Sequence, residues 1–163
     1  MRHPSIRLSL AICLLIPLVA LAQTGSSVVQ TLNIEVKPIT KIAVSGNPGA
    51  LYITDASAGS DVLSVSDNNS NYSMMTNLDN MKIVASINDP MPEGTRLMMK
   101  LESSKGSSSG FVDVSNAMSP VEVVTALGKG SDLNQSITYT FAANASIGQI
   151  NVDSRVVTLT LTN

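Results

Sequence analysis

The chain has 163 residues, a formal net charge of −2 at pH 7, one histidine, one cysteine and no tryptophan. The acidic balance and the lack of a basic stripe argue against a nucleic-acid partner. Hydrophobic residues make up 44% of the chain and charged residues 13%, so one domain of ordinary size can build a core without cross-links.

The first 22 residues are predicted to be a signal peptide. Arg2 and Arg7 precede an uncharged apolar run over residues 8–21, which ends at small residues. This run is shorter than the roughly 20 residues that span a bilayer, so we expect cleavage before Gln23 and no membrane span in the mature chain. The sequence therefore predicts an exported protein, in the periplasm, on the cell surface or outside the cell, with one domain over residues 23–163.

Cleavage at this point would change the chemical inventory. The only histidine, His3, and the only cysteine, Cys13, would both be removed. The remaining 8 basic and 12 acidic side chains would give a net charge of about −4. The mature chain is therefore expected to have no disulfide and to depend on its core for stability.

Apolar residues alternate with polar ones along the whole mature chain, with the period of two that is typical of β-strands. The alternating sets, in chain order, are Leu32, Ile34 and Val36; Ile42 and Val44; Leu51 and Ile53; Leu63 and Val65; Met81, Ile83, Ala85 and Ile87; Leu97, Met99 and Leu101; Val112 and Val114; Val121 and Val123; Ile137, Tyr139 and Phe141; and Val157, Leu159 and Leu161.

Turn-forming residues separate these sets, as in "SGNPG", "SDNNSN", "NDPMPEG", "SSKGSSSG", "GKGSDLNQ" and "NASIGQ". About ten short strands with such spacing predict an all-β fold, an antiparallel β-sandwich in a single domain. The last strand, "SRVVTLTLTN", alternates without a breaker, so we expect it to be well paired in a central position.

Catalysis is not expected, and no cofactor is predicted. Without histidine or cysteine, the mature chain lacks the usual general base, the thiolate nucleophile and the ligands of zinc sites. A carboxylate pair could still hydrolyse glycosides, but the acidic residues fall mostly in predicted turns or on solvent-facing positions.

Three local patterns partly match known kinds of binding site. Asp67, Asn69 and Asn71 have the alternate spacing of a calcium loop, but Tyr72 and Leu78 stand where that loop needs glycine and glutamate, so a turn is the prediction. Lys129, between two glycines, also predicts a turn.

The methionines form the third pattern, since thioethers bind Cu(I). Seven of them follow the signal segment: Met74, Met75, Met81, Met91, Met98, Met99 and Met118. Neighbouring residues on a strand point to opposite faces, so the adjacent pairs cannot chelate as pairs, and core packing is the expected role.

The amino end of the mature chain carries a detachable apolar stripe, Leu32, Ile34 and Val36. A strand of this kind either completes its own sandwich or enters the groove of a neighbouring subunit as a donated strand. Both alternatives stay open from the sequence. We take these three residues as the candidate subunit contact.

The segments "LNIEVKPITKIAVSG", "YSMMTNLDNMKIVASI" and "RVVTLTLT" resemble small exported bacterial β-sandwich proteins of uncharacterised function and, more loosely, the major pilins of alternate chaperone–usher fimbriae. The resemblance implies an immunoglobulin-like or pilin-like sandwich and a donor-strand role for Leu32, Ile34 and Val36. The chain departs from the pattern at Thr162, where typical pilins carry an aromatic residue, and at Pro38, which would end the donor strand early.

Together these observations predict a non-catalytic structural or adhesive surface subunit, with self-assembly or a surface protein as partner. The first alternative is a monomeric binding module for a polysaccharide or protein. A periplasmic copper-handling protein that uses methionine is the second.

Overall fold

The computed structural model describes residues 25–55 and 57–163. The predicted signal peptide, residues 1–22, and the predicted mature terminus at Gln23 lie outside the described residues. Contacts divide the chain into Met1–Glu35 and a compact unit, Val36–Asn163. Among the described residues, the compact unit holds all the regular secondary structure, and this is β-structure apart from one 3₁₀ turn.

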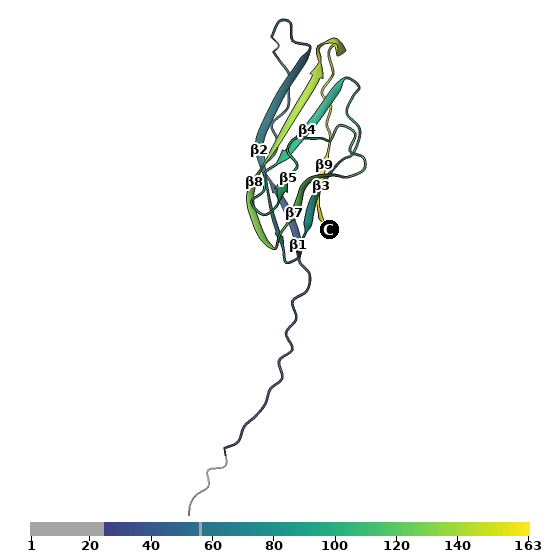
Figure 1. Ribbon diagram of the computed structural model, residues 1–163. Coiled ribbons are helices and arrows are strands. Elements are labelled where there is room, and N and C mark those ends of the chain that lie inside the picture. The colour runs from purple at the N-terminus through teal and green to yellow at the C-terminus, as the bar shows by residue number, and fades with distance from the viewer. Residues whose placement is uncertain (1–24, 56) are drawn as a thin grey trace, which may run out of the picture. The chain divides into compact units, whose positions relative to one another are not determined.

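Nine strands and the 3₁₀ turn follow one another along the compact unit (Figure 1). They are β1 (Thr40–Ser45), β2 (Val62–Thr76), β3 (Met81–Ile87), β4 (Thr95–Leu101), β5 (Ser107–Ser108), β6 (Val112–Asp113), β7 (Val121–Leu127), β8 (Gly130–Asn144), η1 (Ala145–Ile147) and β9 (Val157–Thr162).

The strands form two antiparallel sheets. The larger sheet has the order β1-β2-β8-β4-β6, and the smaller sheet has the order β5-β7-β3-β9. Strands β2 and β8 have 15 residues each, whereas β3 and β7 have 7 and β9 has 6. The larger sheet is therefore much longer than the smaller one, which determines where the candidate site lies.

One hydrophobic core lies between the two sheets. Both sheets contribute fully buried side chains to it, almost all aliphatic: Tyr72, Met74, Met81, Ile83, Ala85, Ile87, Leu97, Met99, Leu101, Val114, Ala117, Val123, Val124, Leu127 and Ile137. Val, Ile, Leu and Met pack well on pleated strands, and Met fills gaps in a core that contains a single buried aromatic ring. The arrangement is sandwich-like, and the described residues contain no cysteine.

Several strands predicted by alternation are confirmed. Met81–Ile87 and Thr95–Leu101 occur where the apolar faces were expected, and Val157–Thr162 forms the last strand. The methionine pairs divide as strand geometry requires, since Met74 is buried while Met75 is half-exposed.

The turn predicted at "SDNNSN" is wrong. Residues 66–71 lie inside β2, which continues through them with a β-bulge between Asp67 and Ser70. The Asp67 carboxylate accepts hydrogen bonds from the backbone N and side-chain Nδ2 of Asn69, at 3.1 and 2.5 Å. The polar side chains therefore stabilise a bulge, which re-phases the strand, instead of ending it. "GKGSDLNQ" is likewise mostly strand β8, with its turn at Gly128 and Lys129.

Two predicted strands are not formed. Leu51 and Ile53 alternate as expected, but their segment takes no regular secondary structure. Residues 25–39, which include Leu32, Ile34 and Val36, also lie outside any strand. Alternation shows that one face of an extended segment is apolar, but a strand also requires a neighbour to bond with.

The central position predicted for the last strand is wrong. Strand β9 lies at the edge of the smaller sheet and pairs only with β3, from Val157↔Ile87 to Thr162↔Lys82. Strand β1 is an edge of the larger sheet on the same side, and the two edge strands approach each other without pairing. This side of the sandwich is thus bordered by two strands with unused hydrogen-bonding edges.

Asp132, on β8, anchors the connection that follows β4. It is 1% exposed, and its carboxylate accepts hydrogen bonds from the hydroxyls of Ser103 and Ser104, both at 2.7 Å, and from the Ser104 backbone N at 2.9 Å. Burial alone would raise the pKa of Asp132, but these hydrogen bonds outweigh it and lower the pKa. The nearby Tyr72 hydroxyl donates to the Glu102 carbonyl at 2.7 Å, and burial raises the pKa of Tyr72 to about 12.

We predict that Asp132→Asn destabilises the protein by about 2 kcal/mol at pH 7, because an amide nitrogen turns toward buried donors. The pKa of Asp132 is depressed in the folded state, so its contribution is complete above the unfolded-state pKa of about 3.9 and is lost as the pH falls through the folded-state value. Urea unfolding at pH 7 and pH 3 should show the difference from wild type shrinking at the lower pH.

Asp79→Asn is the matched control, since Asp79 pairs with Lys129 at 2.8 Å on the exposed surface. This change should alter the free energy of unfolding by less than about 1 kcal/mol. Equal effects of the two substitutions would contradict the anchoring role of Asp132.

Candidate functional site

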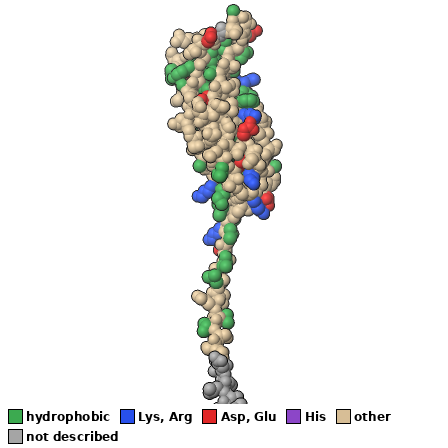
Figure 2. Space-filling view, turned by 90° about the vertical axis from the view of Figure 1, so that its left-hand side faces the viewer, with side chains coloured by type: hydrophobic (Ala, Val, Ile, Leu, Met, Phe, Trp, Pro, Cys, Tyr) green, Lys and Arg blue, Asp and Glu red, His purple; other side chains and the backbone are tan. Residues whose placement is uncertain are grey.

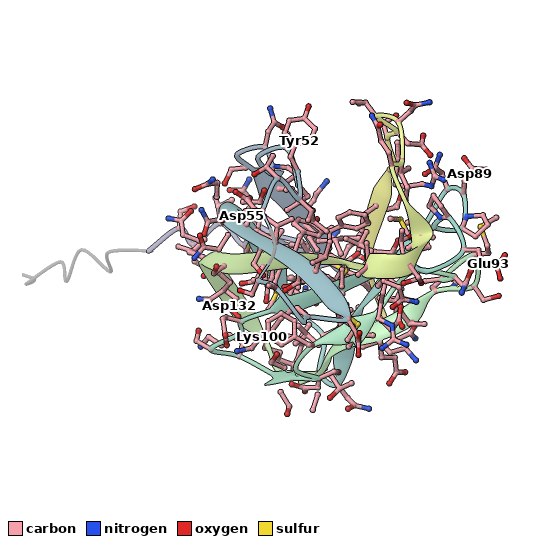
Figure 3. All side chains as sticks on the ribbon, turned by 90° about the horizontal axis from the view of Figure 1, so that it is seen from above. Tyr52, Asp55, Asp89, Glu93, Lys100 and Asp132 are labelled. Carbon is pink, nitrogen blue, oxygen red and sulfur yellow. The ribbon has the colours of Figure 1, made fainter. Side chains whose placement is uncertain are left out.

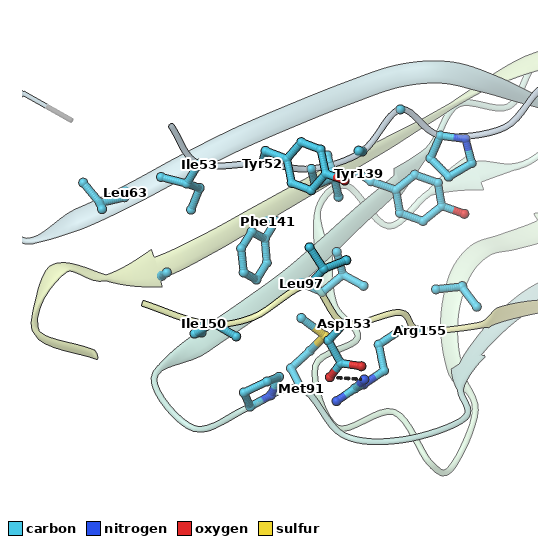
Figure 4. Close-up of a pocket in the computed structure, with 18 of the residues that line it drawn as sticks. Tyr52, Ile53, Leu63, Met91, Leu97, Tyr139, Phe141, Ile150, Asp153 and Arg155 are labelled. Carbon is cyan, nitrogen blue, oxygen red and sulfur yellow. Dashed lines mark hydrogen bonds and ion pairs between the residues drawn. The ribbon is translucent and has the colours of Figure 1, made fainter. Parts of the chain in front are cut away.

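An apolar groove of about 890 Å³ opens at the end of the compact unit where β2 begins and β8 ends (Figure 4). Its floor is the inner face of the larger sheet, and its two walls are irregular segments, residues 47–54 and 148–156. The floor includes Leu63, Leu97, Tyr139, Phe141 and Ala143, and the walls add Leu51, Tyr52, Ile53, Met91 and Ile150 among others.

The groove exists because the two sheets differ in length. Strands β2 and β8 stay paired up to Val62↔Asn144, whereas β3 and β9 have their last pair at Ile87↔Val157. Beyond that level, the larger sheet still presents an apolar inner face, but no strand of the smaller sheet covers it. The two irregular segments border this face without closing over it.

Two aromatic rings on β8 form the centre of the floor. Tyr139 and Phe141 point inward, in phase with the buried Ile137, yet both remain only half-buried. In Figure 4, Phe141 projects between the segment of Tyr52 and Ile53 and the segment of Ile150. Burial raises the pKa of Tyr139, which keeps its hydroxyl neutral at any physiological pH. The two rings therefore give the centre of the floor an uncharged apolar surface.

The first wall, residues 47–54, has few hydrogen bonds. Among the described residues, its one backbone hydrogen bond runs from Tyr52 N to the Ala50 carbonyl, at 3.1 Å. Leu51 and Ile53 turn partly toward the core while Tyr52 is 59% exposed. Viewed from above, Tyr52 lies at the periphery of the unit (Figure 3). The wall keeps strand-like alternation without a bonding partner.

The second wall, residues 148–156, is fixed at its lower end by Arg155. Its guanidinium donates two hydrogen bonds to the Pro90 carbonyl, at 3.1 and 3.0 Å, and pairs with Asp153 at 2.6 Å. The hydrogen bond from Arg155 lowers the pKa of Asp153. Val156 and Asn88 add two further hydrogen bonds, at 2.7 and 3.1 Å. Among the described residues, no loop or side-chain hydrogen bond involves residues 149–152.

Both walls thus offer unused backbone N–H and C=O groups above an apolar floor. An extended peptide is the ligand whose chemistry matches this combination, since its backbone can bond to the walls while alternate side chains fill the floor. The described residues contain no cluster of three or more acidic, His or Cys side chains that could hold a metal ion.

The predicted subunit-contact residues are not among those that line the groove. Leu32, Ile34 and Val36 are 77%, 82% and 77% exposed, and hydrophobic side chains along residues 25–39 stand uncovered in Figure 2. Three aliphatic side chains at alternate positions, all exposed, are unusual for a stable surface. The stripe is therefore an exposed apolar surface.

The other sequence candidates are scattered. Asp67, Asn69 and Asn71 lie on the β2 bulge, where Asn69 occupies the Asp67 carboxylate. Lys129 lies in the β7–β8 turn and pairs with Asp79. Met74 and Met99 are core residues, as expected for gap-filling side chains.

The groove itself was missed from the sequence. Its aromatic floor was present in the alternation of Tyr139 and Phe141, and its first wall in that of Leu51 and Ile53. The sequence does not show that the segment of Leu51 and Ile53 leaves the rings of Tyr139 and Phe141 only half-buried. One signal was available: the five aromatic residues of the chain include Tyr52, Tyr139 and Phe141, which all line the groove.

Comparisons with models of protein families, with curated proteins and with solved structures give no match for this chain. No helix in the described part of the chain has the length and apolarity needed to cross a membrane.

We predict that Arg155→Ala loosens the second wall, because the Pro90 carbonyl loses both charge-assisted hydrogen bonds. Hydrogen exchange at the Asn88 and Val156 amides, which are bonded beside this anchor, should accelerate roughly tenfold or more. Asp153→Asn is the control, since it removes the ion pair but keeps the bonds to Pro90, and it should change exchange much less. Unchanged exchange in Arg155→Ala would show that the wall is held by other contacts.

Proposed function

We propose that the chain is an exported, non-catalytic structural or adhesive surface subunit that assembles with copies of itself by strand donation. The stripe Leu32, Ile34 and Val36 of one copy enters the groove of the next as an extended strand. The observation that carries this proposal is the complementarity of two unpaired features, an apolar stripe with strand alternation and an apolar groove with free backbone groups in both walls. The sandwich that this proposal requires is of the pilin-like type, with one strand position open to a donor from the next copy.

The positions of the groove and of the chain's entry into the compact unit support this assembly. The chain enters β1 beside the β2–β3 turn, where Asn77 bonds the Lys37 carbonyl at 2.9 Å and the Ile39 N at 2.7 Å. The groove opens at the other end of the unit, near Leu63 and Ala143. A donor and an acceptor at opposite ends make a heterologous contact that repeats head to tail, which is the geometry of an open filament.

The burial of apolar side chains favours strand donation. Burying three aliphatic side chains contributes about 5–9 kcal/mol before the cost of ordering the donor, and the backbone bonds to the walls add to this. The half-buried Tyr139 and Phe141 would become covered at the same time. Before those costs, about 5–9 kcal/mol corresponds to dissociation constants between roughly 0.2 mM and 0.3 μM, so the backbone bonds to the walls must offset the cost of ordering the donor.

We predict that Leu32→Asp combined with Ile34→Asp abolishes assembly, because two charges would be buried against the floor of the groove. The mature chain, residues 23–163, should form polymers by light scattering after gel filtration, and this variant should remain a monomer. Its thermal unfolding should be unchanged, since both side chains are exposed in the unassembled chain.

Thr31→Asp with Asn33→Asp provides the matched control, because it places the same two charges on the alternate, polar positions of the segment. This variant should still polymerise. A wild-type chain that stays monomeric at all concentrations would overturn the proposal.

The second candidate function is a monomeric binding module for a protein or polysaccharide, and the grouping of Tyr52, Tyr139 and Phe141 at the groove favours it. A monomeric wild-type chain whose groove binds an extended peptide of other sequence would support this function.

A further inference from the structure

Ser70 is the one described residue with a buried side-chain oxygen or nitrogen that has no hydrogen-bond partner. It is 1% exposed and lies on β2 immediately after the bulge, at the lower end of the groove, which it helps to line. Gly46 packs directly against this part of β2, because a Cβ at Gly46 would lie 3.4 Å from the Ser70 Cα and would clash with the Asn69 carbonyl oxygen. A buried hydroxyl without a partner is costly and rare, so a ligand that satisfies it gains specificity at that point.

Between Val28 and Val36, the segment proposed as the donor, one polar residue is in phase with the apolar stripe. In an extended strand, Val28, Gln30, Leu32, Ile34 and Val36 share one face. Gln30 is thus the polar position of an otherwise aliphatic face, and its carboxamide can both donate to and accept from a hydroxyl. A single buried polar pair of this kind fixes the register of packed elements in other proteins.

The lengths of donor and groove agree when Gln30 is placed beside Ser70. Seven residues along β2, less one for the bulge, separate Ser70 from Leu63 at the open end, a span of about 20 Å. Six residues separate Gln30 from Val36, again about 20 Å. The three stripe residues then lie over Tyr139, Phe141 and the open end, and Pro38 falls outside the groove.

The direction of the donor follows from the same placement. A strand that runs from Ser70 toward the open end is antiparallel to residues 148–156, which lead down into β9. The opposite direction would place the stripe between β1 and β9, where the two edge strands already approach each other. The open part of the groove therefore accepts only the first direction.

We propose, on the basis of the function proposed above, that Gln30 of each donor copy hydrogen-bonds the Ser70 hydroxyl of its acceptor copy and so sets the register of the inserted strand. The contact selects a second copy of this chain over an arbitrary apolar strand, because a strand without a polar group at this position leaves the buried hydroxyl unsatisfied.

Disulfide cross-linking tests the register, since the mature chain has no cysteine of its own. One chain carries Gln30→Cys, the other carries Ser70→Cys, and the two are mixed, allowed to assemble and oxidised. The expected product is a covalent dimer in which mass spectrometry finds the linked peptides of positions 30 and 70. Leu32→Cys is the matched control, as it lies on the same face two residues away and should give at most a few per cent of that product.

The outcomes separate the register from the function. Preferential linkage of position 32 to position 70 would overturn the register while leaving strand donation intact. Polymers that cross-link at neither position would also overturn it. A link formed inside one chain carrying both cysteines, with no dimers from the mixture, would place the strand in its own sandwich and overturn both proposals.

Substitutions that form no covalent bond provide an independent readout. Ser70→Ala and Gln30→Leu should each raise the concentration needed for assembly roughly three- to tenfold, because each leaves one polar group buried without a partner. The double variant should assemble at a concentration close to that of the wild type, since two apolar groups then face each other. Additive losses would contradict a direct contact between the two side chains.

Discussion

The whole site depends on one constraint, the unequal length of two sheets that share a core. Strands β2 and β8 remain paired over nearly their full lengths, so the larger sheet carries its apolar inner face well past the end of the smaller sheet. A packed interior cannot form where one layer is absent. The effect is clearest at Tyr139 and Phe141, whose aromatic rings face inward but are only half-buried. The groove and its two weakly bonded walls are both consequences of this difference in length.

The bulge at Asp67–Ser70 is what keeps this long strand in phase with the core. Leu63 and Val65 face inward before it, and Tyr72 and Met74 face inward after it, although their numbers differ in parity. Without the extra residue, one half of β2 would present its polar face to the interior. The same bulge places Ser70 at the base of the groove. A local irregularity therefore sets both the continuity of the larger sheet and the chemistry at one end of the site.

Alternation predicted the all-β class and most strands, because a strand with one buried face imposes a period of two on its sequence. Alternation did not predict the structure correctly where the presence of a neighbouring strand decides whether an extended segment becomes a strand. Leu51 and Ile53 have the same pattern as Leu97 and Met99, yet only the second pair belongs to a strand, since β4 has β8 beside it. The polar run at Asp67 suggested a turn, but its side chains bond locally within a bulge. Alternation also could not predict that β9 lies at the edge of its sheet, because the order of strands in a sheet depends on the topology of the whole fold.

The attachment of Lys37 and Ile39 to Asn77 has a mechanical consequence. A pull on Lys37 along the axis of β1 would load the ladder between β1 and β2 in shear, because the hydrogen bonds of that ladder run across the axis. The backbone hydrogen bonds between Thr40↔Thr76 and Ser45↔Asn71 would therefore bear the force at the same time and would not break one after another. The hydrogen bonds of the Asn77 side chain to Lys37 and Ile39 would be loaded first, and they hold the start of β1 against β2.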